Sequence, residues 1–369
     1  MKSEWRTVAL GSVADLTVGF VGTMASNYTE TGIPFLRSTN IEPFDIKLDD
    51  IKYISSNFNE SLRKSELHPN DVVIVRTGTP GACAVIPAGV KAWNCSDLVI
   101  VRPHRNKLNP LFLASYVNLA SGVINTQLVG AVQQHYNVGA AKKMQIPLPP
   151  IGEQDKIASI IGMLNKKITI NSKINDNLQQ QAQAIYSSMF IDNPDPAWSH
   201  GHLSDLITVK YGKDHKKLAD GIYPVYGSGG IMRYVERPLY NKESVLIPRK
   251  GTLNNVMYVN QPFWSVDTMF YTEMKLPNVA KFVYHFVKAK DLASMNAGSA
   301  VPSMTTDILN AMEVVIPSAS ALEEFESLVA PMYEAMEAND VQSKALSQIR
   351  DTLLPKLMSG EIDVSDVQL

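Results

Sequence analysis

The sequence predicts an α+β protein in which two α/β domains are each followed by a long helix. Three observations predict this fold: one unit of roughly 170–195 residues occurs twice, each copy mixes short β-rich runs with turns, and each copy ends in a helix-like segment. A chain of 369 residues has room for two or three domains of ~100–200 residues each.

Four pairs of similar segments carry the repeat, and their order is the same in both halves. The pairs are Leu10–Gly19 with Leu203–Gly212, Ile33–Ile41 with Tyr223–Ile231, Asp71–Thr79 with Ser244–Thr252, and Met144–Pro149 with Met312–Pro317. The offset between the copies falls from 193 to 168 residues along the chain. The first copy therefore carries about 25 more residues, which we expect in loops.

Each copy is predicted to end in one long helix that packs through an apolar stripe. The segment Glu153–Phe190 contains no proline, and its apolar residues recur at steps of three and four. The second copy repeats this pattern at an offset of 168, and Asn171 and Asn339 occupy the same place on the two stripes. Such an asparagine either fixes the register of two helices or lies partly exposed at the edge of the stripe. Pro331 predicts a kink or a restart in the second helix.

The segments before the helices are predicted to be mixed α/β, because β-rich runs alternate there with Gly, Pro and Asn turns. The β-rich runs are Val72–Val75, Leu98–Val101, Val245–Ile247 and Val256–Val259, and short helices are expected at Pro110–Ser121 and Asn278–Ala289. The predicted organisation is a first domain at 1–150, a first helix at 151–191, a second domain at 197–318 and a second helix at 319–360.

Composition and motifs exclude several classes of protein. No apolar run approaches the ~20 residues of a membrane span, and the start of the chain lacks the apolar core of a signal peptide. Two cysteines, Cys83 and Cys95, make no disulfide framework and fit no common zinc spacing, so we expect a cytoplasmic protein. There is no Walker loop, H-E-x-x-H or G-x-S-x-G motif. Tyr226–Gly230 lacks the G-x-G-x-x-G spacing and indicates a turn between strands.

The basic residues give a positive indication of partners. The net charge is −2, so contact with nucleic acid requires a local basic face. Between Asp205 and Lys250 nine Lys and Arg outnumber five Asp and Glu, with tyrosines interleaved. These cations either contact phosphates or form a solvated surface. Equivalent loops of the first copy are also polar, so we predict DNA contacts from both copies. They are Arg37, Ser38, Asn40, Arg76 and Thr79 in the first domain, and Lys213, Lys216, Arg233, Arg249 and Lys250 in the second.

Two stretches resemble the specificity subunit of type I restriction–modification systems. They are Ile146–Gln154, which leads into the first helix, and Ile349–Ile362 near the end of the chain. Ile247–Thr252 and Tyr223–Gly230 are similar to the recognition domains of that family. The resemblance covers essentially the whole chain. It implies two target-recognition domains, each recognising one half of a split double-stranded DNA site, separated by two long antiparallel, coiled-coil-like helices.

The resemblance also implies partners and a division of labour. The helices would bind two methyltransferase subunits, and a nuclease–translocase subunit would join the larger complex. Methyl donor, ATP and magnesium would belong to these partners, so this chain is expected to hold no active site, metal or cofactor. Its implied function is sequence-specific DNA binding that directs adenine methylation and restriction.

Two other functions are weighed against this one. The first is a coiled-coil scaffold that assembles protein partners without DNA recognition, which the near-neutral net charge leaves open. The second is a self-sufficient methyltransferase, which the absent motifs disfavour. DNA binding with a steep salt dependence separates the first alternative from a specificity subunit, because only phosphate neutralisation produces that dependence.

Overall fold

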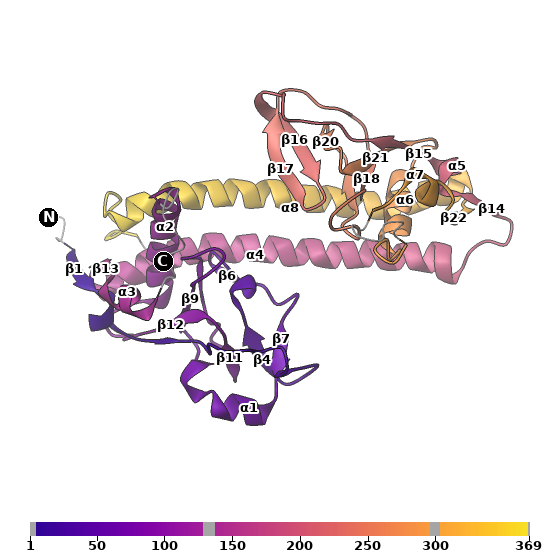
Figure 1. The fold of residues 1–369 in the computed structure, drawn as a ribbon. Coiled ribbons are helices and arrows are strands. Elements are labelled where there is room, and N and C mark those ends of the chain that lie inside the picture. Colours follow the sequence, from indigo (N-terminus) through magenta and orange to yellow (C-terminus); the bar gives the residue numbers. More distant parts are fainter. Residues whose placement is uncertain (1–4, 128–136, 296–302, 368–369) are drawn as a thin grey trace. The chain divides into compact units, whose positions relative to one another are not determined.

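A computed structural model describes residues 5–127, 137–295 and 303–367 of the chain. The chain divides into two compact units, which we call unit 1 (Met1–Asn171 with Asp340–Leu369) and unit 2 (Ser172–Asn339). The division falls within two long helices, α4 (Ile151–Ser187) and α8 (Ala319–Met358). Each unit therefore contains one sheet-rich domain and a part of both helices (Figure 1).

Strand pairing confirms the internal repeat. The strands β1 (Arg6–Ala9) and β13 (Gln145–Leu148) pair antiparallel, as do β14 (Ser199–His202) and β22 (Glu313–Ile316). Arg6 lies opposite Leu148, and Ser199 lies opposite Ile316, so the register repeats with the offsets of 193 and 168 seen in the sequence. The two halves of the chain therefore share one topology.

Unit 1 contains two larger sheets. An antiparallel sheet has the order β10 (Cys83–Val85), β9 (Val72–Val75), β12 (Leu98–Pro103), β2 (Ala14–Val18). A mixed sheet has the order β3 (Tyr28–Thr29), β7 (Lys52–Ile54), β4 (Ile33–Leu36), β11 (Trp93–Cys95), β8 (Glu66–Leu67), with β4 and β11 parallel. Unit 1 also contains the pair β5 (Ile41–Glu42) and β6 (Asp45–Ile46) and the helices α1 (Ser56–Ser61), α2 (Pro110–Gln127) and α3 (Val138–Lys143).

Unit 2 repeats this plan with fewer strands. Its antiparallel sheet has the order β15 (Ile207–Tyr211), β21 (Met269–Met274), β18 (Ser244–Pro248), β19 (Met257–Val259). A second sheet has the order β17 (Gly230–Val235), β16 (Asp220–Gly227), β20 (Trp264–Ser265), and its short helices are α5 (Leu203–Leu206), α6 (Ala280–Lys288) and α7 (Thr306–Asn310). The turn predicted at Tyr226–Gly230 joins β16 to β17. Part of the extra length of the first copy forms β3 and β8, so the expectation that it lies in loops was wrong there.

The four predicted β-rich runs fall on strands β9, β12, β18 and β19, and both faces of the central sheets are buried. Val72 and Ile74 pack on the side of α2, whereas Val73 and Val75 pack on the opposite side of the same strand. Neighbouring residues of a strand point to opposite faces, so a strand that is covered on both sides must be apolar throughout. This explains why these runs are continuous rather than alternating.

The helices α4 and α8 have 37 and 40 residues, which gives lengths of roughly 56 and 60 Å. In unit 1 the Asn171 side chain is fully buried and donates to Gln342 Oε1 at 2.9 Å and Ser343 Oγ at 3.1 Å. Arg350 Nη1 donates to Asn165 Oδ1 at 2.9 Å, so the partner residue number falls as the α4 number rises and the pairing is antiparallel. The alternative of a partly exposed asparagine was wrong for Asn171, whereas Asn339 is partly exposed.

In unit 2, too, polar side chains join α4 to α8. Asn339 Nδ2 donates to Asn175 Oδ1 at 2.9 Å, and Asn175 Nδ2 donates to the carbonyl of Met336 at 3.1 Å. The helix α8 continues through Pro331 without a restart, so that part of the prediction was wrong. The α-helix α4 ends at Ser187, and Ser188–Asp192 continue the helix as a π-helical turn. No helix of the described residues is both long enough and apolar enough to cross a membrane.

Candidate nucleic-acid interface

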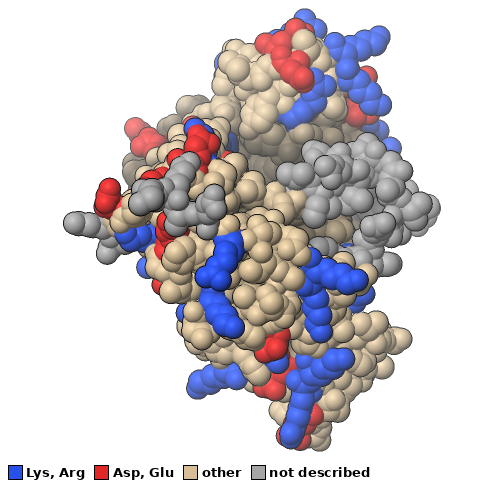
Figure 2. All heavy atoms as spheres, turned by 90° about the vertical axis from the view of Figure 1, so that its left-hand side faces the viewer, with Lys and Arg blue, Asp and Glu red and all other residues tan. Residues whose placement is uncertain are grey.

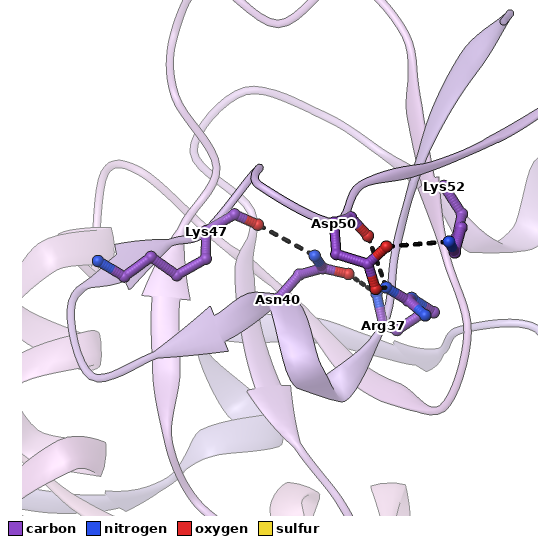
Figure 3. A network of polar contacts seen from close by, with 5 residues as sticks. All are labelled: Arg37, Asn40, Lys47, Asp50 and Lys52. Carbon is purple, nitrogen blue, oxygen red and sulfur yellow. Dashed lines mark hydrogen bonds and ion pairs between the residues drawn. The ribbon is translucent and has the colours of Figure 1, made fainter. Parts of the chain in front are cut away.

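The first group of predicted DNA contacts lies around the 3-10 turn Ser38–Asn40 in unit 1 (Figure 3). Asn40 is only 2% exposed. Its Oδ1 accepts the backbone N–H of Arg37 at 3.0 Å, and its Nδ2 donates to the carbonyl of Lys47 at 3.0 Å. Asn40 therefore stabilises this loop, and its amide is already used within the protein.

Arg37 is engaged in the same loop. Its Nη2 donates to the Asp50 carbonyl at 2.6 Å and forms an ion pair with Asp50 Oδ2 at 2.8 Å, while Lys52 contacts the other carboxylate oxygen at 2.9 Å. The hydrogen bonds from Arg37 and Lys52 hold the pKa of Asp50 down to about 2, so the carboxylate stays charged. Arg37 is thus partly neutralised, whereas Ser38 remains half-buried at the start of the turn.

The second group lies on the turn between β9 and β10, which carries Arg76, Gly78 and Thr79. Gly78 has φ of +92°, where a side chain would be strained, and Thr79 is exposed. Arg76 Nη1 donates to Asp97 Oδ1 at 2.7 Å, and Thr77 Oγ1 donates to Asp97 Oδ2 at 2.8 Å. The turn therefore presents a guanidinium whose orientation is set by a carboxylate.

In unit 2 the equivalent turn follows β18 and carries Arg249, Lys250 and Gly251, with Gly251 at φ of +85°. The guanidinium of Arg249 lies 5.3 Å from the centre of the Tyr211 ring, and its Nη1 donates to the Asp267 carbonyl at 3.4 Å. Lys250 is exposed beside it. No carboxylate pairs with Arg249 among the described residues, so this turn keeps its positive charge.

Lys213 is anchored to the same segment of unit 2 as Arg249 and Lys250. Its backbone N–H donates to the Ser265 carbonyl at 2.8 Å, and the backbone N–H groups of Arg249 and Lys250 both donate to the Thr268 carbonyl. Segment 265–268 thus anchors all three cations. Ser228, in the β16–β17 turn, lies against Gly251, because a Cβ on Gly251 would come 2.6 Å from Ser228 Oγ. Polar and cationic groups therefore gather around this segment.

Arg233 and Lys216 occupy a different part of unit 2. Arg233 Nη2 donates to the Leu218 carbonyl at 3.0 Å and to Asp220 Oδ1 at 2.7 Å. Lys216 is exposed, and its backbone N–H donates to Asp214 Oδ1. Lys216 belongs to the 214–220 loop, and Arg233, on β17, reaches that loop with its side chain. Among the described residues, neither side chain contacts the Arg249 turn.

Sequence reasoning missed Asp97, although the repeat contained a signal for it. The strands β11 and β20 run parallel to β4 and β16, and Cys95 and Ser265 hold equivalent places in that pairing. Two residues later stand Asp97 and Asp267. An aspartate at the same place of both copies could have been noticed, but its arginine partner lies 21 residues away in sequence.

Lys and Arg side chains form small separate groups on the face in Figure 2, with uncharged surface between them. No three His, Cys, Asp or Glu side chains of the described ranges gather as a metal ion would require. Burial raises the pKa of both Cys83 and Cys95, which keeps these thiols protonated. The polar turns, rather than a titratable cluster, are therefore the candidate site.

Comparison with protein families gives a match over most of the chain. A family model described as "Type I restriction modification DNA specificity domain" matches residues 2–180 and again residues 197–325. The two matches correspond to the two copies of the repeat.

Individual relatives are more distant. The MjaIX specificity subunit of a type I restriction enzyme from Methanocaldococcus jannaschii is 24% identical over 270 residues, which covers 61% of this chain and 62% of the relative. The HindI specificity subunit from Haemophilus influenzae is 34% identical over 92 residues, which covers 25% of this chain and 18% of the relative. The matched parts thus span less than two thirds of these relatives.

A crystal structure with a similar fold is also known. The S subunit of a type I restriction–modification system from M. genitalium has a TM-score of 0.60 and 17% identity, and the match covers 96% of each chain. At this level of identity the likeness concerns the fold alone. It confirms the predicted fold class of two α/β domains in an internal repeat with two long helices.

Proposed function

The chain belongs to the family of type I restriction modification DNA specificity domains, and on this basis we propose that its two domains each bind one half of a split double-stranded DNA site. The observation that carries this proposal is the repeated turn, Arg76–Gly78 in unit 1 and Arg249–Gly251 in unit 2, which presents an arginine at equivalent places of both copies. Arginine is the residue that most often contacts guanine in the major groove.

The proposal assigns a role to each part of the chain. Residues 1–150 and 197–318 act as target-recognition domains, and residues 151–191 and 319–360 act as spacer helices. The candidate DNA contacts in unit 1 are Arg76 and Thr79, with Arg37, Ser38 and Asn40 in a supporting loop. In unit 2 they are Lys213, Arg249 and Lys250, with Lys216 and Arg233 in the separate region around the 214–220 loop.

The spacer helices are the proposed docking surface for two methyltransferase subunits, and a nuclease–translocase subunit joins the larger complex. Large apolar side chains on both helices support this assignment, because they remain exposed after the helices have paired. They are Met163, Ile170, Ile174, Leu328, Val341 and Ile349, each 39–62% exposed. Met163, Ile170 and Ile174 recur at steps of seven and four on α4 and therefore share one face of that helix, and a contiguous exposed apolar face is typical of an interaction surface.

In this proposal the chain is a non-catalytic subunit that directs adenine methylation and restriction by its partners. It acts on DNA in the cytoplasm. No observation favours the scaffold over the specificity subunit, because both functions predict exposed apolar faces on the helices.

Single-molecule sequencing of modified bases in the host genome tests the proposal. We expect a split methylated motif that disappears when the gene is deleted. Exchange of residues 1–150 for the corresponding domain of another family member should change one half of the motif and leave the other half unchanged. A change in both halves would contradict independent recognition, and an unchanged methylome after deletion would contradict the function itself.

A binding titration separates this function from a scaffold. The affinity of the full chain, without its partners, for random duplex DNA should fall steeply as salt rises, with a slope of about −0.9 per neutralised phosphate. A scaffold without DNA contact would bind no duplex at any salt concentration.

A further inference from the structure

Among the described residues of unit 1, the carboxylate of Asp97 occupies an unusual place beside the Arg76 turn. We propose that Asp97 is a positioning residue, which holds the Arg76 guanidinium in one orientation for recognition of a base edge and at the same time weakens binding to unspecific DNA. This inference rests on the proposed function, because it concerns how the same turn distinguishes DNA sequences.

Both oxygens of the Asp97 carboxylate are used within the turn. Oδ1 accepts from Arg76 Nη1 at 2.7 Å, and Oδ2 accepts from Thr77 Oγ1 at 2.8 Å. The backbone of Asp97 is also fixed, since its N–H donates to the Phe20 carbonyl at 3.1 Å and its φ is +53°. The carboxylate is thus held by its backbone and by Thr77 Oγ1, and it offers the Arg76 guanidinium an acceptor at one place.

The guanidinium keeps donors for a ligand. Its Nη2 has no partner among the described residues and is not buried, so it is free to donate to a ligand. Its Nε, in contrast, is buried without a partner. The Arg76 side chain is 17% exposed, so most of it is packed and only its end reaches solvent. A planar fork held in this way loses little conformational freedom when it binds the O6 and N7 acceptors of guanine.

The negative charge of Asp97 lowers the affinity for DNA of any sequence. Its side chain is 39% exposed and carries a negative charge next to the proposed interface. A carboxylate near the phosphates repels them whatever the sequence, whereas an oriented arginine helps only at the matching base. Asp97 therefore raises the ratio of specific to unspecific affinity through both effects, since specificity is a difference between two affinities.

The test uses Asp97→Asn in the full chain assembled with its methyltransferase partners. Asparagine tolerates a positive φ and has the same shape, but its amide has one acceptor oxygen, so the change removes the charge and one of the two hydrogen bonds from Arg76 and Thr77. We expect the affinity for the cognate duplex to fall about tenfold, while the affinity for random duplex stays the same or rises about twofold. Base preference should relax at one position of the half-site bound by unit 1.

Asp15→Asn is the matched control. Asp15 is an exposed residue of β2. The same substitution there removes one negative charge from unit 1 at a side chain that does not contact Arg76. Its cognate and random affinities should change equally. An equal rise in both affinities for Asp97→Asn would overturn the proposal, because Asp97 would then act only as a counter-charge.

Arg76→Lys keeps the charge but removes the planar fork, and it serves as a second test that does not depend on Asp97. Its cognate affinity should fall about tenfold with random affinity unchanged. Full cognate preference in Arg76→Lys would overturn the inference even if Asp97→Asn failed to fold. Equal affinity of the wild-type complex for cognate and random DNA would instead contradict the proposed function.

Discussion

The two units join their sheet domains to the long helices through the same topology but with different chemistry. In unit 1 the joining helix is α2, which carries no Asp, Glu, Lys, Arg or His and buries Phe112, Leu113 and Val117 against α4 and α8. In unit 2 the joining helix is α6, which buries Lys281 and His285 at 4% and 0% exposure. One junction is held by apolar packing, and the other contains charges.

The unit 2 junction satisfies each of these polar groups. Lys281 Nζ forms ion pairs with Glu326 at 2.6 Å and Glu243 at 3.1 Å, and it lies over the rings of Tyr258 and Tyr333. His285 Nδ1 lies 2.8 Å from Gln183 Oε1, and its Nε2 lies 2.9 Å from the Tyr333 hydroxyl. A repeated fold therefore does not require a repeated set of stabilising interactions, and the two junctions should respond differently to charge and pH.

The largest effects are expected from truncation of a buried side chain at either junction. Lys281→Ala leaves Glu243 and Glu326 without their shared cation, so the free energy of unfolding of unit 2 should fall by about 3 kcal/mol. Chemical denaturation with amide hydrogen exchange would show faster exchange in residues 172–339 than in 5–127. As the apolar counterpart, Leu113→Ala should lower protection in unit 1 by ~2–5 kcal/mol through the cavity it creates. A loss below about 0.5 kcal/mol for Lys281→Ala would show that the ion pairs do not stabilise this junction.

A second prediction concerns acid sensitivity. Burial lowers the pKa of His285 from its ordinary 6.5 to about 4, and a neutral ring with Nδ1 as donor and Nε2 as acceptor satisfies both of its contacts. Between pH 6.5 and pH 4 the unfolded state therefore binds more protons than the folded state. The contribution of neutral His285 to the free energy of unfolding is fully present above pH 6.5, and it is lost as the pH falls from 6.5 to about 4. The loss reaches on the order of 3 kcal/mol.

The His285→Gln variant isolates this contribution. Other groups titrate in both proteins, so the difference between the two unfolding curves against pH reports His285 alone. We expect the wild type to lose stability more steeply than the variant below pH 6.5, with hydrogen exchange increasing first in unit 2. Parallel curves would mean that the histidine does not remain neutral in the folded state.

The smallest effect is expected at the Arg249 turn. Tyr211→Ala removes the ring under the guanidinium, and an exposed cation–π contact contributes ~0.5–1 kcal/mol, so DNA affinity should fall by about two- to fivefold. Tyr211→Phe keeps the ring and should bind like the wild type. A loss larger than that of Asp97→Asn would indicate that the tyrosine contacts DNA directly.

Most of the fold followed from local sequence patterns. The β-rich runs, both long helices and the repeat were predictable because burial imposes a period on residues that are close in sequence. Even the register of β14 with β22 follows from that of β1 with β13, since the same offsets apply. The continuous path of α8 through Pro331 was not predictable from the local pattern, because packing of the helix outweighs one missing hydrogen bond.

Sequence alone indicated that Arg37, Asn40, Arg76 and Arg249 lie in polar turns, and that Arg76 and Arg249 hold the same place in the two copies. The tertiary structure decided what each of them does there. Asn40 is buried and holds its own loop, Arg37 is paired with Asp50, and Arg76 is paired with Asp97, whereas Arg249 stacks on Tyr211. Composition and periodicity indicate which residues are exposed or buried. The partner of a charged side chain, in contrast, is whichever opposite charge the fold brings within about 4 Å. For Arg76 that partner is 21 residues away in sequence, so only the tertiary structure identifies it.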